Sequence, residues 1–116
     1  MEQPKLFDRK KLEGTAQGEQ LALYALGEFQ SRGLALAGRV LPLDRLRGAL
    51  RRAAEDLGVE EISDEAAVAA FSSLGAQVRR VPAFVAKHPF RVTVGEELCA
   101  RARQFYEERT ALKKSG

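Results

Sequence analysis

The chain of 116 residues is long enough for a single domain with one modest core. Its 45% hydrophobic and 30% charged residues are typical of a globular protein and exclude a disordered chain. No apolar run approaches the roughly 20 residues of a membrane-spanning helix, and the N-terminus lacks the apolar stretch of a secretory signal. The single cysteine, Cys99, excludes an internal disulfide and fits a reducing compartment, so we expect a cytoplasmic protein.

The N-terminal third predicts a polar arm followed by one helix. Residues 1–14 are polar and include a proline and a glycine, so we interpret them as an arm. Thr15 has the side chain of an N-cap, and apolar residues at helical spacing follow it as far as Gly33. Gly27 inside this helix costs about 1 kcal/mol relative to alanine, which indicates close packing at that position.

The middle of the chain predicts a short strand and two helices. Residues 38–41 favour an edge strand, because the proline that follows cannot donate to a central ladder. Asp44 is expected to cap an amphipathic helix that ends at Gly58. A third helix is expected to begin after Ser63, its N-cap, and to end at a left-handed Gly75.

The last third predicts a β-hairpin and a long helix. The segments 76–81 and 90–94 alternate between apolar and polar residues like two paired strands. The loop between them contains two prolines and is too long for a two-residue turn. A helix over residues 95–114 follows, and it carries one apolar stripe: Leu98, Ala102, Phe105 and Leu112.

These elements predict a mostly α fold with a small β-hairpin (α+β). The order helix, short strand, helix, helix, strand, strand, helix resembles the winged helix-turn-helix superfamily, and the strings LGAQVRRV and PFRVTV carry the likeness in the hairpin. The resemblance implies a winged-helix-like domain over residues 15–94 with an added C-terminal helix over residues 95–116. It also implies that the hairpin is a wing and that the helix after Ser63 enters the major groove of DNA.

The hairpin carries the clearest functional signal. Residues 66–95 contain no acidic residue, yet they include Arg79, Arg80, Lys87 and Arg91. Because neighbouring strand residues point to opposite faces, only one of the two adjacent arginines can share a face with the other cations. Such a cluster neutralises phosphates and gives an affinity that falls steeply with salt. We therefore predict a DNA-binding module that holds the phosphate backbone through this hairpin, as a transcriptional regulator or a phage or plasmid protein.

Further candidate contacts surround the hairpin. The small polar residues can hydrogen-bond to DNA, and arginines on the preceding helix can extend the basic surface. The opposing interpretation is a solvated helix face, with the arginines paired to Glu55 and Asp56 at helical spacing on their own helix. The candidates are Ser72, Ser73, Gln77, Arg45 and Arg52.

The start of the third helix supports an alternative function. Asp64 and Glu65 open this helix, no basic residue follows, and carboxylates at that place repel phosphates. In the alternative, the domain is a protein-interaction adaptor whose acidic helix meets a basic partner, with Phe84 of the hairpin loop as an anchor. A third interpretation pairs the basic hairpin with acids of the same chain, namely Glu60, Glu61, Asp64 and Glu65.

Catalysis has no support in the sequence. One histidine, His88, and one distant cysteine cannot form a zinc site, and no glycine-rich phosphate loop is present. The segment around Glu19 resembles the opening helix of some small restriction-endonuclease-like nucleases, but the acid-x-lysine pair that such folds need is missing. We expect no enzyme activity and no cofactor. The apolar stripe of the last helix either forms a homodimer or packs onto the first helix.

Overall fold

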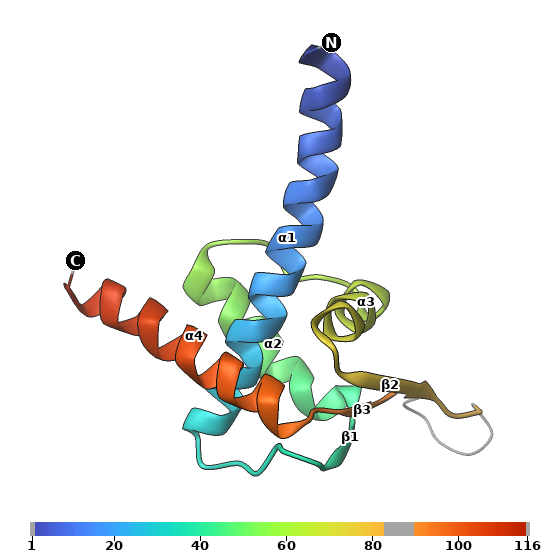
Figure 1. The fold of residues 1–116 in the computed structure, drawn as a ribbon, viewed down its shortest axis with the longest axis vertical. Coiled ribbons are helices and arrows are strands. Elements are labelled where there is room, and N and C mark those ends of the chain that lie inside the picture. The colour runs from blue at the N-terminus through green and yellow to red at the C-terminus, as the bar shows by residue number, and fades with distance from the viewer. Residues whose placement is uncertain (1, 83–89, 116) are drawn as a thin grey trace.

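The computed structural model describes the backbone of residues 2–82 and 90–115 and the side chains of residues 17–82 and 90–112. Within these ranges the helices lie above a three-stranded antiparallel sheet (Figure 1). The predicted fold class, mostly α with a small β component, is confirmed. The elements are α1 (Glu2–Ser31), β1 (Val40–Pro42), α2 (Leu43–Leu57), α3 (Asp64–Leu74), β2 (Gln77–Arg80), β3 (Phe90–Thr93) and α4 (Glu96–Ser115).

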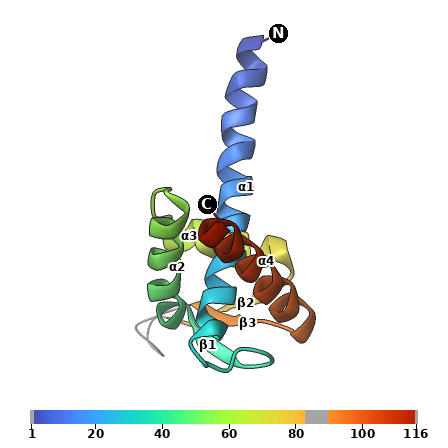
Figure 2. The ribbon, with the colours of Figure 1, turned by 90° about the vertical axis from the view of Figure 1, so that its left-hand side faces the viewer.

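The largest difference from the sequence prediction is the length of α1. The helix begins at Glu2, not after Thr15, and it runs through the segment that we interpreted as an arm. Pro4 lies in the first turn, where its missing N–H removes no intrahelical hydrogen bond. Figures 1 and 2 both show the N-terminal half of α1 projecting away from the rest of the domain.

The C-terminal half of α1 passes through the centre of the core, where it packs on α2, α3 and α4. Its residues Leu21, Tyr24 and Leu26 are among the largest fully buried side chains. A Cβ atom built on Gly27 would lie 2.4 Å from the carbonyl oxygen of Ala102 on α4. Since real Cβ atoms do not approach so closely, only glycine fits this crossing, and the predicted reason for Gly27 is confirmed.

The ends of α2 and α3 follow the capping signals except at one point. Ser63 caps α3, because its hydroxyl oxygen accepts a hydrogen bond from the backbone N–H of Ala66 at 3.1 Å. Gly58 and Gly75 end α2 and α3 with positive φ angles of 69° and 108°, as predicted. Asp44 is not an N-cap: α2 starts one residue before it, and its carboxylate stands in the first turn, where the helix dipole favours it.

The apolar stripe of α4 is used mainly inside the domain. Leu98 and Ala102 are 6% and 0% exposed, and α4 packs along α1. These two residues are therefore not available to a second chain, and the prediction of a dimer contact is wrong for them. Phe105 is half-buried and Leu112 is 67% exposed. Within the described residues, no helix is both long and apolar enough to cross a membrane.

Candidate nucleic-acid interface

The register of the hairpin brings Arg79 and Arg91 together. The two residues are direct partners in the antiparallel β2–β3 ladder, so their side chains leave the same face of the sheet. Val92, one residue away on β3, is 1% exposed and faces the core, which places the two arginines on the outer face. Arg79 is exposed and Arg91 is half-buried. Of the two adjacent arginines, only Arg79 shares a face with Arg91.

Arg80 lies on the opposite face, at the rim of the sheet. It is exposed, and its guanidinium carbon lies 5.4 Å from the centroid of the Phe90 ring, its partner in the ladder. This distance is within the range of a cation–π contact, which holds the side chain close to the strand. Arg80 therefore adds a positive charge to the side of the hairpin that faces α3, not to the outer face.

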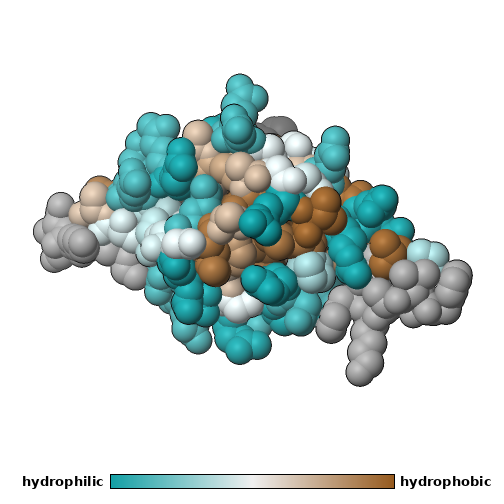
Figure 3. Space-filling model, turned by 90° about the horizontal axis from the view of Figure 1, so that it is seen from below, coloured by the Kyte–Doolittle hydropathy of each residue, from teal (hydrophilic) through white to brown (hydrophobic). Residues whose placement is uncertain are grey.

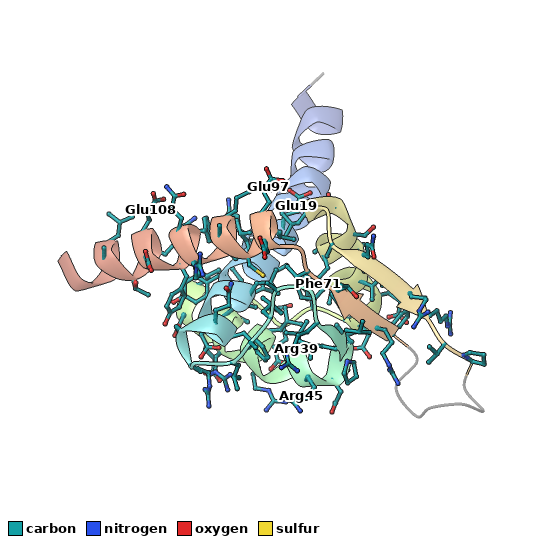
Figure 4. All side chains as sticks on the ribbon, turned by 60° about the horizontal axis from the view of Figure 1, so that its bottom comes forward. Glu19, Arg39, Arg45, Phe71, Glu97 and Glu108 are labelled. Carbon is teal, nitrogen blue, oxygen red and sulfur yellow. The ribbon has the colours of Figure 1, made fainter. Side chains whose placement is uncertain are left out.

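The start of α2 adjoins the outer face. Pro42 of β1 pairs with Arg91 of β3, and α2 begins at the next residue, so its first turn lies beside Arg91. Arg45 in this turn and Arg39 before β1 are both exposed. Figure 4 shows these two side chains on the lower side of the domain. Seen from below, an apolar strip crosses the centre of the molecule and hydrophilic side chains flank it (Figure 3).

The acids that we considered as partners of the hairpin pair with α2 instead. Asp64 accepts a hydrogen bond from Arg47, and the Glu61 carboxylate lies 3.8 Å from Nε of Arg51. Within the described residues, neither Arg79 nor Arg80 forms an ion pair. The interpretation in which Glu61 and Asp64 neutralise the hairpin is therefore wrong for Arg79 and Arg80.

The exposed face of α3 is small and weakly polar. Glu65, Ala69 and Ser72 are exposed on it. Ser73 donates a hydrogen bond to the carboxylate of Glu19 on α1, which occupies its hydroxyl. Gln77 is exposed on the outer face of β2. Two further candidates of the hairpin loop, Phe84 and Lys87, lie outside the described residues, as does the single histidine, His88.

Arg52, a predicted DNA contact, instead forms an ion pair within the fold that the sequence did not predict. Its Nε lies 2.8 Å and its second terminal nitrogen 3.2 Å from the two carboxylate oxygens of Glu28, whose side chain is only 10% exposed. This hydrogen bonding holds the pKa of Arg52 above its ordinary value. Arg32 stands 3.6 Å from the same carboxylate. The spacing from Leu21 through Ala25 to Glu28 was the available signal, because it places Glu28 on the buried stripe of α1.

A second polar contact joins α1 to α2. The hydroxyl of Tyr24 donates to Oδ2 of Asp56 at 2.8 Å, and the ring stands edge-on to Tyr106 of α4 with centroids 4.9 Å apart. Burial and this hydrogen bond raise the pKa of Tyr24 well above its ordinary value. Asp56, which helical spacing predicted as a partner of the α2 arginines, thus accepts a hydrogen bond from Tyr24.

Cys99 is a structural thiol. It is buried, its Sγ lies 4.0 Å from the carbonyl oxygen of Val94, and burial raises the pKa of the thiol. Among the residues whose side chains are described, no group of three histidine, cysteine, aspartate or glutamate side chains is arranged to hold a metal ion.

Comparisons with known proteins add no relatives. No model of a protein family matches this chain, and neither a curated protein nor a solved structure matches it.

Proposed function

We propose that this domain binds duplex DNA through the phosphate backbone, with the β2–β3 hairpin as the main contact. The observation that carries the proposal is the direct opposition of Arg79 and Arg91 on the outer face of the sheet. Like charges opposite one another destabilise a strand pair, and a phosphate bound between them offsets that cost. The planar guanidinium group also fits two phosphate oxygens at once.

The architecture supports this proposal. The order of the elements and the strand order β1-β3-β2 agree with the winged helix-turn-helix arrangement that the sequence resembles. In that arrangement α2 and α3 form the helix-turn-helix and the β2–β3 hairpin forms the wing. Arg45, in the first turn of α2 beside the hairpin, then extends the backbone contact.

The surface of α3 argues for binding with little sequence preference. Its exposed Ala69 and Ser72 are short, Ser73 is bonded to Glu19, and Glu65 repels phosphate. The Asp64 carboxylate is compensated by Arg47, which reduces the repulsion at the start of this helix. We therefore propose that phosphate contacts position the domain and that base reading contributes little.

The test is a titration of a labelled random-sequence duplex at about 50 mM and about 200 mM salt. Wild-type protein should bind at low salt and lose affinity steeply as salt rises. The double change Arg79→Ala with Arg91→Ala should reduce the slope of log affinity against log salt by roughly 0.9 for each lost contact. The matched control Arg101→Ala with Arg103→Ala removes two exposed charges from α4 and should leave affinity nearly unchanged.

Two outcomes contradict the proposal. One is no binding at low salt, which favours the adaptor function with Glu65 facing a basic protein partner. The other is an equal loss in the hairpin and α4 variants, which means that the hairpin is not the contact.

A further inference from the structure

The sheet has a solvent-facing side that extends over all three strands. The register and the alternation of strand residues place two rows of side chains on it. The rows are Pro42, Arg91 and Arg79, followed by Val40, Thr93 and Gln77. Leu41 and Val92, which alternate with them, are buried and point to the core. Val40 on β1 is 57% exposed, and none of the side chains in the two rows of this outer face is acidic.

Two further arginines border the outer face beside β1. Arg39 directly precedes this strand, and the backbone N–H of Gly38 donates to the carbonyl oxygen of Val94 at 2.8 Å, which fixes the turn before it. Gly38 has a φ of 73°, a left-handed conformation that favours glycine. Arg45 lies in the first turn of α2, and Figure 4 shows both exposed arginines on the lower side of the domain. Positive charge therefore extends from Arg79 on β2 across the sheet to both of them.

The helix α3 lies above β2, on the core side of the sheet (Figure 1). Residues 53–78, which include this helix, contain acidic residues and no lysine or arginine. The acids nearest to the outer face along the chain are Asp44 on α2 and Glu96 on α4. Glu97, the next residue of α4, lies with Glu19 on the upper side of the domain in Figure 4. The outer face is thus more positive than the exposed side of α3.

We propose that duplex DNA lies across the whole outer face, from the hairpin to Arg39 and Arg45, and that α3 faces away from it. This inference rests on the proposed function, and it differs from the arrangement that the winged-helix resemblance implies, in which α3 enters the major groove. Adjacent strands lie about 4.8 Å apart, so the backbones of β1 and β2 are separated by about 10 Å. With its side chains, such a face is wider than the two-stranded ribbon that the major groove admits. The arginines therefore meet phosphates on both sides of the groove, while Val40 and Thr93 lie between them.

The first test adds one carboxylate to each side of the domain. Val40→Glu charges the outer face at a position outside the hairpin, and the matched control Ala69→Glu charges the exposed side of α3. We expect the affinity for a labelled random-sequence duplex at about 50 mM salt to fall roughly tenfold in Val40→Glu, because the carboxylate repels the phosphates. The change Ala69→Glu should leave the affinity within about twofold of wild type, because salt screens distant charges. A loss in Ala69→Glu without a loss in Val40→Glu overturns the proposal and favours insertion of α3.

The second test measures a gain of binding, which a folding defect cannot produce. Val40→Lys should tighten duplex binding and steepen the slope of log affinity against log salt by roughly 0.9, since it adds a phosphate contact. Ala69→Lys, the matched control, should leave the slope unchanged. An unchanged slope in Val40→Lys, or an equal gain in both lysine variants, overturns the proposal. These outcomes differ from failure of the proposed function, in which the wild-type protein does not bind or the double change Arg79→Ala with Arg91→Ala leaves binding unchanged.

Discussion

The arginines of the helical body, which is formed by α1 to α4, differ from those of the β2–β3 hairpin in the groups that surround them. On α2, Arg52 binds the nearly buried Glu28, and Arg51 lies beside Glu61. On the hairpin, Arg79 faces Arg91 across two strands and forms no ion pair within the described residues. The α2 arginines are thus bonded within the fold, whereas Arg79 has no acidic partner among the described residues. This contrast is the one that the proposed function explains, because it assigns Arg79 to DNA and the α2 arginines to the fold.

The largest expected effect tests the packing of the helical body. Gly27→Ala should lower the free energy of unfolding by about 2 kcal/mol, because the new Cβ overlaps Ala102 and Tyr106 and overpacking outweighs helix propensity. Gly48→Ala on α2 is the matched control. Its Cβ meets only Arg52, at an ordinary 3.5 Å, so this change should stabilise by about 0.5 kcal/mol. Urea unfolding of both variants measures the contrast, and a stabilised Gly27→Ala variant disproves the close α1–α4 crossing.

The next effect tests the ion pair of the body. Arg52→Ala should cost about 1.5 kcal/mol of unfolding free energy, because it leaves the Glu28 carboxylate nearly buried with Arg32 as its remaining cation. In a double-mutant cycle with Glu28→Gln, the two losses should not add. Additive losses would show that the pair contributes nothing and would remove the contrast with the hairpin.

The third effect is pH-dependent. Tyr24 has its pKa raised in the folded state, so its contribution to stability is fully present below about pH 10, the ordinary tyrosine value. This contribution falls as pH rises above that value, because the hydroxyl ionises first in the unfolded chain. Tyr24→Phe should cost about 1 kcal/mol at pH 7. The wild-type advantage over Tyr24→Phe should then shrink above pH 10 in chemical unfolding experiments. A constant advantage up to pH 11 would contradict the contact.

Much of the fold follows from local signals in the sequence. Ser63, Gly58 and Gly75 mark helix ends by the chemistry of capping, which depends on few neighbours. The start of α1 was predicted too far along the chain, because Pro4 and Gly14 were interpreted as signs of an arm. Proline does not end a helix when it lies in the first turn, and one glycine does not end a long helix. The prediction that Asp44 caps α2 was wrong because aspartate is favoured both at the N-cap and in the first turn of a helix. Its residue type therefore does not distinguish the two positions.

The candidate site was predicted only in part. Strand alternation was enough to separate Arg79 from Arg80, but the pairing of Arg79 with Arg91 depends on a register that the long loop does not determine. The partners of Arg52 and Asp64 lie on other helices, 24 and 17 residues away. Helical spacing alone therefore assigned the α2 arginines to the wrong acids.

The most direct test of the contrast between the two regions is Arg79→Ala, measured for both stability and DNA binding. Removing one of two opposed positive charges should leave the free energy of unfolding unchanged or raise it by about 0.5 kcal/mol. The same change should weaken binding to a random duplex and reduce the salt slope by roughly 0.9. A loss of stability with unchanged duplex binding would show that Arg79 serves the fold, and it would contradict the account.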